Sequence, residues 1–485
     1  MIKFKDFSFS YNGSMEKINS INLNIKKGEF IVITGESGCG KTTIIRCING
    51  LVPHFFTGKY SGEVIVNGQV VANAPLWKLG MVVASVFQDP SSQFFAKNVK
   101  DEVAFGVENY GYQSPELNER VENAINEVGI QDILTSNMFT RSNGQKQKVA
   151  IASALAVAPS IFVFDEPSAN LDMKATLQLA WIMQKLKEAG HTIVVAEHRL
   201  YYLAGLFDRL IYMQNGNIRK EIFHDSFMLL SQKELTSLGL RSNNIASLSA
   251  KRSKNKEMKP TISISNLSFA YKKNKILENL NWIIGKGEII ALVGENGVGK
   301  TTIARLLCGL IKEKSGMIEF AGSEIKKRKR MKKAYYVMQD TDCQLFTESV
   351  SEELTSGTED NSNIDEILKK YMLLDYKARH PASLSGGQKQ RLTLAVAEII
   401  DRDILILDEP TSGLDGANMR RIAGIIKELS EQGKTIIVIT HDYEFILSCC
   451  SRVSIMKDRT IIENISVEKG MENQIREVME GKLYY

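Results

Sequence analysis

The octapeptide Gly35-Glu36-Ser37-Gly38-Cys39-Gly40-Lys41-Thr42 fits the pattern G-x-x-x-x-G-K-[ST], and the pattern returns at Gly294-Glu295-Asn296-Gly297-Val298-Gly299-Lys300-Thr301. Each copy follows a short apolar run, Phe30 to Thr34 or Ile289 to Val293, and precedes a stretch of helical character. Glycines at these positions let backbone N–H groups close around phosphate oxygens at a helix N-terminus, where the helix dipole favours negative charge. Two complete copies therefore predict two phosphate-binding loops.

The residues that end each loop carry the expected phosphate and metal contacts. The lysine is predicted to reach the terminal phosphates, the first threonine to ligate Mg²⁺, and the next threonine to contact phosphate. These residues are Lys41, Thr42 and Thr43 in the first loop and Lys300, Thr301 and Thr302 in the second. An ordinary glycine-rich turn is the alternative for a single match, and the repetition argues against it.

The composition is that of a globular chain of two to four domains. The 485 residues are 44% hydrophobic and 24% charged, and no run of 18 apolar residues predicts a membrane span. The first residues, Met1 to Asp6, do not resemble a signal peptide. Six cysteines without a C-x-x-C pair argue for a reducing cytosol and against a zinc or iron–sulfur site.

The net charge of +5 is modest, and the basic residues cluster in two segments, Lys326 to Lys333 and Lys251 to Lys259. A solvated face or a linker is one interpretation of such segments. Contact with anionic lipid headgroups or with nucleic acid is the other.

A repeat extends well beyond the two loops. Lys41 and Lys300 are 259 positions apart (300 − 41), whereas three later motifs recur at a constant offset of 243 (408 − 165). The recurring pairs are Ser142-Asn143-Gly144-Gln145 with Ser385-Gly386-Gly387-Gln388, Val163 to Pro167 with Ile406 to Pro410, and His198 with His441. We therefore predict a first domain at 1–235 and a second at 261–485. The segment 236–260, rich in Ser, Asn and Lys, is predicted to be a flexible tether.

Each half alternates short β-branched stretches with helical ones. Residues 118–128 and 418–431 are predicted to be helices, and 192–196 and 435–440 buried strands. This pattern predicts an α/β fold with a mainly parallel sheet, in which functional loops leave the carboxyl ends of the strands.

An acidic pair follows an apolar run in each half, Asp165-Glu166 after Ile161 to Phe164 and Asp408-Glu409 after Ile404 to Leu407. An aspartate at the end of a strand beside a phosphate loop is suited to orient the Mg²⁺ shell. The following glutamate is suited to polarise an attacking water. A surface acidic pair is the alternative, and the recurrence argues against it.

Three further pairs are candidates for contact with nucleotide. His198 and His441 each follow their Asp by 33 positions and are predicted to sense the γ-phosphate, although a lone His is more often structural. A Gln after a strand, at Gln88 and Gln339, is suited to touch Mg²⁺ and water through its amide. Tyr11 and Tyr271 precede the loops and are candidates to stack on adenine, with packing inside a β-subdomain as the alternative.

In the order of these motifs the chain resembles the ATP-binding-cassette ATPases over essentially its whole length apart from the tether. The resemblance implies two tandem domains, each with a parallel core, an antiparallel β-subdomain and a helical subdomain, and ATP and Mg²⁺ as ligands. It also implies head-to-tail pairing, with ATP between the loop of one domain and the signature of the other. One implied site joins Lys41, Gln88, Asp165, Glu166 and His198 to Ser385, Gly386, Gly387 and Gln388; the other joins Lys300, Gln339, Asp408, Glu409 and His441 to Ser142, Asn143, Gly144 and Gln145. Asp172 and Asp415 match the family's aspartate that links the two sites.

A narrower resemblance is to the ATPases of energy-coupling-factor importers, carried by Gln88 to Phe95, Gln339 to Phe346 and Asp101 to Gly106. It implies an energising subunit for uptake of a vitamin, a vitamin precursor or a metal ion. It further implies a transmembrane coupling subunit and a substrate-binding membrane subunit as partners, peripheral attachment to the cytoplasmic face of the membrane, and no nucleic acid. A tandem ATPase acting on the ribosome and a fused sugar-importer ATPase are the alternatives. The first usually has a long charged helical linker, and the second usually has degenerate motifs in one half.

One departure from the family pattern is Asn143, where the family prefers Gly. If the position needs φ > 0, Asn is the least costly non-Gly residue there, at about 1 kcal/mol. If backbone must approach phosphate closely, the side chain weakens a contact of about 1.5–3 kcal/mol. We therefore expect the site containing Lys300 and Ser142 to be the slower of the two.

Overall fold

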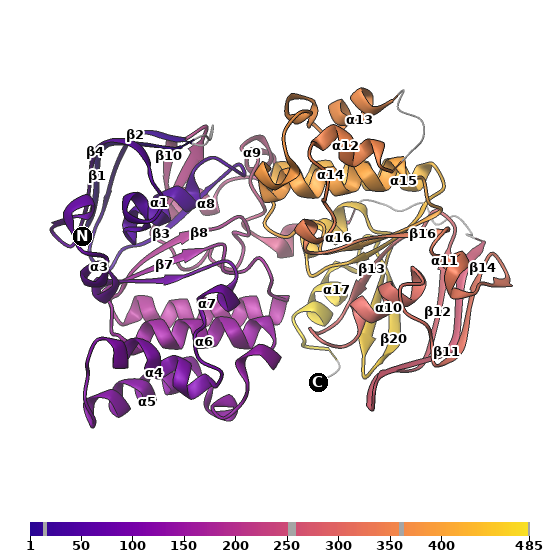
Figure 1. The fold of residues 1–485 in the computed structure, drawn as a ribbon, viewed down its shortest axis with the longest axis horizontal. Coiled ribbons are helices and arrows are strands. Elements are labelled where there is room, and N and C mark those ends of the chain that lie inside the picture. The colour runs from indigo at the N-terminus through magenta and orange to yellow at the C-terminus, as the bar shows by residue number, and fades with distance from the viewer. Residues whose placement is uncertain (13–16, 251–258, 358–362, 484–485) are drawn as a thin grey trace. The chain divides into compact units, whose positions relative to one another are not determined.

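The computed structural model describes residues 1–12, 17–250, 259–357 and 363–483 (Figure 1). By its contacts the chain divides into two compact units. The first contains Met1–Asn244 with the short segment Asp415–Ala417, and the second contains Ile245–Leu414 with Asn418–Tyr485. Each unit is an α/β assembly, as the alternating pattern of the sequence predicts.

A six-stranded central sheet carries the first unit, in the order β10-β9-β3-β8-β7-β6. All neighbours in it are parallel except β10, which runs antiparallel to β9. The strands are β3 (Phe30–Gly35), β6 (Val83–Val86), β7 (Ile161–Asp165), β8 (Thr192–Ala196), β9 (Arg209–Gln214) and β10 (Asn217–Phe223). The phosphate loop, the acidic pair, His198 and Gln88 follow β3, β7, β8 and β6, so the carboxyl edge of one sheet gathers all of them.

The strands of this sheet are continuous apolar runs because both of their faces are buried. Along β3, Val32 faces a core shared with the helices of one side, and Ile31 and Ile33 face a second core on the other side. In Figure 1, α6 (Asn143–Ala156) and α7 (Met173–Glu188) lie beneath the strands, with α4 (Val99–Asn109) and α5 (Glu116–Val128) beyond them.

The second core also holds an antiparallel sheet in the order β2-β1-β4-β5. Its strands are β1 (Ile2–Tyr11), β2 (Lys17–Ile25), β4 (Gly58–Val66) and β5 (Gln69–Val70). In β2, buried and exposed residues alternate, which is the pattern of a sheet with one face on the core. The remaining helices of the unit are α1 (Lys41–Ile48), α2 (Leu51–His54), α3 (Leu76–Val82), α8 (His224–Met228) and α9 (Gln232–Ser237).

The second half repeats this plan, with a mixed sheet β16-β17-β18-β13-β19-β20 and an antiparallel sheet β12-β11-β14-β15. The mixed sheet comprises β13 (Ile289–Val293), β16 (Ala334–Val337), β17 (Ile404–Asp408), β18 (Thr435–Ile439), β19 (Arg452–Lys457) and β20 (Thr460–Ser466). The antiparallel sheet comprises β11 (Pro260–Tyr271), β12 (Asn274–Gly285), β14 (Ser315–Phe320) and β15 (Ser323–Glu324). The helices are α10 (Lys300–Leu307), α11 (Lys327–Arg330), α12 (Val350–Thr355), α13 (Ile364–Lys370), α14 (Gly386–Ile399), α15 (Gly416–Glu431), α16 (Tyr443–Cys449) and α17 (Glu472–Met479).

The segment proposed as a tether, 236–260, begins as folded structure. Residues 236 and 237 end α9, and the hydroxyl of Tyr212 donates to the carbonyl of Leu238 at 3.0 Å. Leu240 belongs to the core of the first unit, and Asn243 donates to the carbonyl of Phe227 at 3.0 Å. Residues 251–258 lie outside the described part, and β11 begins at Pro260. The domain limits at 235 and 261 remain predictions.

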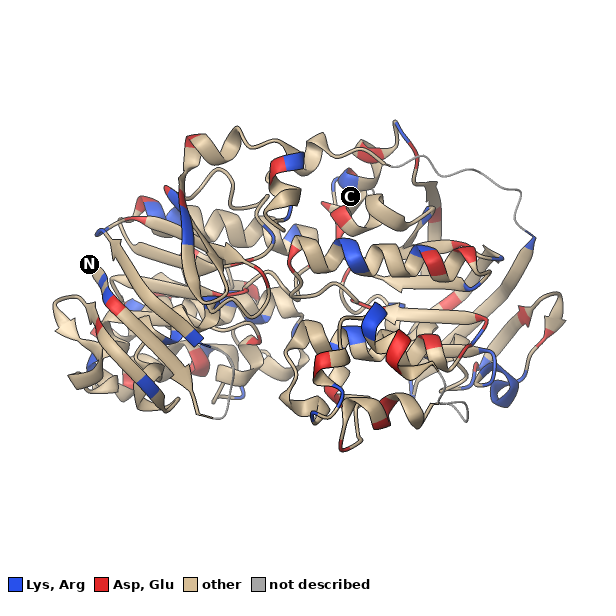
Figure 2. Cartoon of the chain, turned by 90° about the horizontal axis from the view of Figure 1, so that it is seen from above, with Lys and Arg blue, Asp and Glu red and all other residues tan. Residues whose placement is uncertain are grey.

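The basic run Lys326 to Lys333 includes α11, and two of its members have structural partners. Arg330 is 1% exposed and pairs with Glu313 at 2.5 Å, and Lys333 pairs with Asp403 at 2.6 Å. Figure 2 shows acidic and basic residues interspersed over the elements of both units. Within the described residues, no helix combines the length and the apolar composition that crossing a bilayer requires.

Candidate functional site

Each phosphate loop turns directly from a buried strand into a helix. Gly35 ends β3 with φ 147°, and a Cβ there would lie 2.0 Å from the carbonyl oxygen of Met213 in β9. Gly40 precedes α1 with φ 104°, a left-handed conformation that favours glycine. Gly294 and Gly299 repeat both features in the second unit, with φ 153° and 118°. The glycines of the motif are thus required by close backbone approach and by positive φ.

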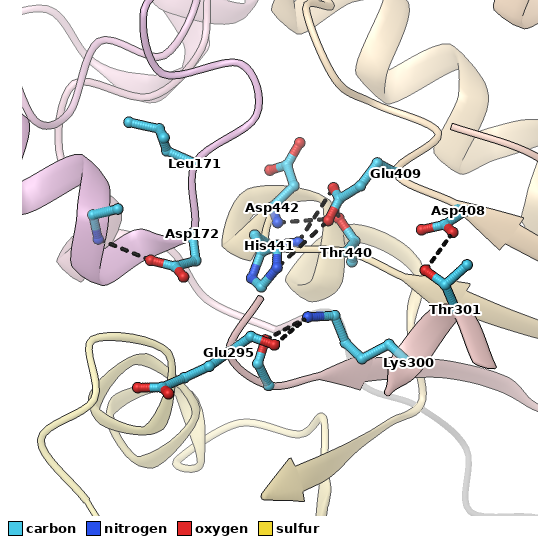
Figure 3. Close-up of polar contacts among 12 residues, drawn as sticks. Leu171, Asp172, Glu295, Lys300, Thr301, Asp408, Glu409, Thr440, His441 and Asp442 are labelled. Carbon is cyan, nitrogen blue, oxygen red and sulfur yellow. Dashed lines mark hydrogen bonds and ion pairs between the residues drawn. The ribbon is translucent and has the colours of Figure 1, made fainter. Parts of the chain in front are cut away.

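The lysine of each loop folds back over its own loop. Lys41 is 4% exposed, and its Nζ donates to the carbonyls of Gly35 at 3.4 Å and Glu36 at 3.1 Å. Among the described residues Lys41 forms no ion pair with a carboxylate. Figure 3 shows the same arrangement for Lys300, whose Nζ donates to the carbonyls of Gly294 at 2.6 Å and Glu295 at 2.9 Å. A buried ammonium held by carbonyl groups beside a helix N-terminus is well suited to an anion.

In each unit the threonine and the aspartate that are proposed to bind Mg²⁺ are in contact. The hydroxyl of Thr42 donates to Asp165 Oδ1 at 3.0 Å, and that of Thr301 donates to Asp408 Oδ2 at 3.1 Å (Figure 3). No group of three or more His, Cys, Asp or Glu side chains in the described residues forms a metal cage. One hydroxyl and one carboxylate fit Mg²⁺, which usually keeps several waters and binds protein carboxylates together with phosphate oxygens.

Burial strongly perturbs the two aspartates. It raises the pKa of Asp165 to about 7, with the neighbouring charge of Glu166 adding to the rise and the Thr42 hydrogen bond opposing it. Burial also raises the pKa of Asp408, but hydrogen bonds from Tyr336 and Thr301 oppose the rise. Ionisation of either aspartate is therefore disfavoured when no cation is bound, and Asp408 has one more hydrogen-bond donor than Asp165 to offset its burial.

The two glutamates hold a strained backbone conformation that the sequence did not predict. Glu166 and Glu409 have φ 46° and 48°, uncommon for a residue with a long side chain. Their N–H groups donate to the carbonyls of Ala196 and Ile439, both at 2.8 Å. Such conformations persist only where the surroundings enforce them. Other matched pairs, such as Asp6 and Asn266, share the positive φ, so it is the position of Glu166 and Glu409 directly after the proposed metal ligand that makes them candidates for function.

Each strained glutamate faces the predicted histidine. His198 Nε2 lies 3.4 Å from Glu166 Oε1, and His441 Nε2 lies 3.7 Å from Glu409 Oε1. In Figure 3 the Glu409 carboxylate also accepts from Thr440 and from the His441 backbone N–H, both at 3.4 Å. Burial raises the pKa of Glu166, but the charge and hydrogen bond of His198 outweigh it, so the net shift is downward. An ionised glutamate near a phosphate loop is able to polarise water.

The signature motifs open α6 and α14 through matching caps. Ser142 Oγ accepts from the Gln145 N–H at 3.3 Å, and the Ser142 N–H donates to Gln145 Oε1 at 3.3 Å. The Ser385 backbone N–H donates to Gln388 Oε1 at 2.9 Å. Each helix N-terminus thus presents free N–H groups to an anion.

Asn143 does not have positive φ, so the first of the two explanations, that Asn strains the backbone at this position, is wrong. It is the first residue of α6, and neither it nor Gly386 has positive φ. A Cβ at Gly386 would meet nothing within 4 Å in this structure, whereas a Cβ at Gly144 would lie 2.9 Å from Ala175 Cβ. The second glycine of the signature is the sterically required one. The explanation through close approach to phosphate stays a prediction.

The remaining predicted residues are placed as follows. Gln88 and Gln339 follow β6 and β16 and are exposed. The Tyr11 hydroxyl contacts Thr43 Oγ1 at 3.2 Å and accepts from Arg46 at 3.0 Å, which ties the ring to the helix of the phosphate loop. Tyr271 lies edge-on to Phe269 and is more exposed. Asp172 caps α7 by accepting from the Ala175 N–H at 2.8 Å.

Sequence reasoning missed four residues that support the site. The Tyr336 hydroxyl donates to Asp408 Oδ2 at 2.5 Å. Glu102 and Glu353, buried 251 positions apart (353 − 102), each accept two backbone N–H groups of the segment that follows Gln88 or Gln339. Arg199 donates to two carbonyls of the turn after Glu166. An acidic pair followed by an apolar residue, Asp101-Glu102-Val103 and Glu352-Glu353-Leu354, recurs in both halves and was the available signal for the glutamates. The other two look like ordinary strand or loop residues.

Comparison with known proteins gives a consistent result. The family model described as "ABC transporter" matches residues 18–169 and again 277–412. A Treponema denticola protein described as an ABC transporter ATP-binding protein is 43% identical, covering 98% of this chain and 99% of that protein. A Methanosarcina mazei protein with the same description is 33% identical, covering 95% and 88%. Among solved structures, a model of ribosome-bound archaeal Pelota and ABCE1 matches with a TM-score of 0.70 at 22% identity, covering 97% of this chain and 80% of that one. At that identity the likeness concerns the fold alone.

Proposed function

The chain belongs to the ABC transporter family of ATP-hydrolysing proteins, and we propose that it is the energising subunit of a membrane importer of the energy-coupling-factor type. Its cargo would be a vitamin, a vitamin precursor or a metal ion. Its partners would be a transmembrane coupling subunit and a membrane subunit that selects the substrate, with the chain attached peripherally at the cytoplasmic face of the membrane. ATP with Mg²⁺ is the ligand of the family.

The observation that carries this proposal is the segment that follows each exposed glutamine. After Gln88, a short 3₁₀ turn at Pro90–Gln93 is capped by Asp89, which accepts from the Ser91 N–H at 2.9 Å. Gln93 then folds back and accepts from the Phe87 N–H at 3.1 Å. Gln344 accepts likewise from the Met338 N–H at 2.7 Å. These hydrogen bonds fix the backbone of a loop that starts at the proposed nucleotide site.

A phenylalanine stands out from each of these loops. Phe95 and Phe346 are 76% and 79% exposed, although their own N–H groups are fixed on the buried carboxylates of Glu102 and Glu353 at 2.9 and 3.0 Å. Single exposed apolar residues are common on protein surfaces. A matched pair that buried glutamates hold in place instead favours a docking point for a partner, since interfaces are enriched in aromatic residues.

The resemblance supplies the remaining part of the proposal, in which each ATP is bound by the loop of one half and by the signature of the other. The lysines and Thr–Asp pairs would hold the phosphates and Mg²⁺, and Glu166 and Glu409 would polarise the attacking water. A helix N-terminus opened by Ser142 or Ser385 would add N–H donors to the γ-phosphate. Hydrolysis removes that phosphate, so the halves would close and open with the nucleotide cycle.

Co-purification with membranes tests the proposal. We expect a hydrophobic membrane subunit to co-purify with the full chain when both are produced together, and Phe95→Ser with Phe346→Ser to abolish the complex while ATP binding stays unchanged. Phe223→Ser is the matched control, because Phe223 is 66% exposed at the end of β10, at the opposite edge of the sheet from β6. A complex that survives the double substitution contradicts the docking role. Recovery of ribosomal RNA with the chain, in place of a membrane subunit, favours the ribosome alternative.

A further inference from the structure

The second unit contains a buried tyrosine in direct contact with a proposed metal ligand. Tyr336 lies on β16, which runs parallel to β17 and pairs Tyr336 with Ile406. Because Asp408 follows Ile406 by two positions, both side chains lie on the same face, and the tyrosine ring reaches forward along the strand. Its hydroxyl donates to Asp408 Oδ2 at 2.5 Å, in a buried setting.

The carboxylate of Asp408 is held by two donors on one oxygen. Oδ2 accepts from Tyr336 and, at 3.1 Å, from the hydroxyl of Thr301. The other oxygen, Oδ1, accepts no hydrogen bond from the described part of the chain. Two donors that converge on Oδ2 fix the rotation of the carboxylate and leave Oδ1 available to a cation or its water shell.

Among the described residues of the first unit, no side chain makes an equivalent contact with Asp165. Ser85 stands in β6 where Tyr336 stands in β16, 251 positions later (336 − 85), and its hydroxyl accepts from Asn49 at 3.0 Å. Cys308 takes the place of Asn49, 259 positions later (308 − 49). Within the described residues Asp165 accepts a side-chain hydrogen bond from Thr42 alone. A serine–asparagine pair thus replaces the tyrosine–aspartate contact.

We propose that Tyr336 is a positioning residue for Mg²⁺ in the second unit, acting by orienting the Asp408 carboxylate. Partners in the second shell of a metal site orient the ligands, and their removal costs about 10- to 100-fold in metal affinity. Removing the Tyr336 hydroxyl should therefore weaken cation binding at the second unit. In the first unit, Ser85 stands in place of Tyr336, so no such effect is expected there. The inference depends on ATP hydrolysis with Mg²⁺, which is common to the family, and not on the importer function.

Metal binding at one unit at a time tests this inference. The full chain carrying Lys41→Ala loads nucleotide at the second unit only, and Mn²⁺ is titrated by electron paramagnetic resonance in the presence of a non-hydrolysable ATP analogue. We expect Tyr336→Phe to raise the Mn²⁺ dissociation constant roughly tenfold while the affinity for the analogue without metal is unchanged. Tyr335→Phe is the matched control, since Tyr335 points to the opposite face of the same strand.

The first unit supplies an internal reference. In the full chain carrying Lys300→Ala, which loads the first unit only, Tyr336→Phe is expected to leave the Mn²⁺ dissociation constant unchanged. In a chain carrying Glu166→Gln, whose remaining turnover comes from the site that contains Glu409, it should raise the Mg²⁺ concentration for half-maximal turnover and leave turnover at saturating Mg²⁺ within about twofold. In the chain carrying Lys41→Ala, an Mn²⁺ dissociation constant that Tyr336→Phe leaves within twofold of the parent value overturns the inference. So does a loss of metal-free nucleotide binding, which shows that Tyr336 supports the fold and not the aspartate.

Discussion

The turn that follows the strained glutamate is held by Arg199 and Glu197 in the first unit, where the Ser168 hydroxyl donates to Glu197 Oε1 at 2.9 Å, and by Asp442 in the second. Arg199 donates to the carbonyls of Ser168 and Leu171, both at 3.3 Å. In the second unit Thr411 donates to Asp442 at 2.7 Å. Glu166 and Glu409 keep the same left-handed φ in spite of this exchange. The backbone geometry is therefore what the repeat preserves, and the side chains that support it are replaceable.

The two units differ more consequentially at two points close to the proposed chemistry. Asn143 opens the signature helix of the first unit where Gly386 opens that of the second. Asp165 has one side-chain donor where Asp408 has two. The phosphate-loop lysines and threonines, the glutamates and the histidines of the proposal are matched. We therefore expect two competent sites with unequal properties.

Removing one phosphate-loop lysine at a time separates the two sites and has the largest expected effect. Lys41→Ala and Lys300→Ala should each lower nucleotide affinity at the altered unit about 100-fold, because a charge-assisted contact contributes about 1.5–3 kcal/mol and the buried lysine makes more than one. Isothermal titration with an ATP analogue should then give one tight site per chain for either variant. Two tight sites in both variants would contradict the claim that each lysine holds the nucleotide of its own unit.

Exchanging the signature residue tests the next difference. Asn143→Gly should speed, and Gly386→Asn should slow, turnover at the site that each signature completes, by roughly ten- to a hundredfold, through one phosphate contact. Both variants should melt within about 1 °C of the parent, because neither position has positive φ and a Cβ at Gly386 meets no neighbouring atom. Single-turnover kinetics measure the rates. Unchanged rates would show that an Asn side chain at this position does not weaken the contact with phosphate.

The two aspartates should differ in their effect on stability in the absence of nucleotide and metal. Folding raises the pKa of Asp165 from 3.8 to about 7. The protonated carboxyl therefore makes its full contribution to the free energy of unfolding below pH 3.8, and this contribution is lost as the pH rises to about 7. Asp165→Asn removes the buried charge and should raise the free energy of unfolding by about 4 kcal/mol at pH 8, because one pKa unit corresponds to about 1.4 kcal/mol, with little gain at pH 4. Thermal melts at both pH values measure this.

Asp408→Asn is the comparison, and it should gain less at pH 8. Tyr336 and Thr301 both donate to the ionised Asp408, and the amide cannot accept from them as strongly. An equal gain in the free energy of unfolding for both variants would show that the two aspartates do not differ electrostatically.

Much of this architecture could be predicted because it follows from local rules. The strands at 192–196 and 289–293 match the structure to the residue, since strands buried on both faces are short apolar runs. The phosphate loops, the Thr–Asp contacts and the Glu–His pairs follow from motifs at fixed spacing along one sheet edge. Tyr336 and Arg199 could not be predicted, because their contacts depend on strand pairing and on a turn whose backbone path no local pattern encodes. The packing of residues 238–243 was missed because polar composition concealed the role of Leu240.

Turnover by glutamate variants tests most directly the claim that both units hydrolyse ATP, but unequally. Steady-state ATP hydrolysis is measured for Glu166→Gln, Glu409→Gln and the double variant in the full chain. The account predicts that Glu409→Gln keeps most of the activity and Glu166→Gln keeps about a tenth, because Asn143 slows the site that contains Glu409. The double variant should lose turnover by a factor of about 100 or more. Equal residual activities in the single variants, or turnover that persists in the double variant, would contradict it.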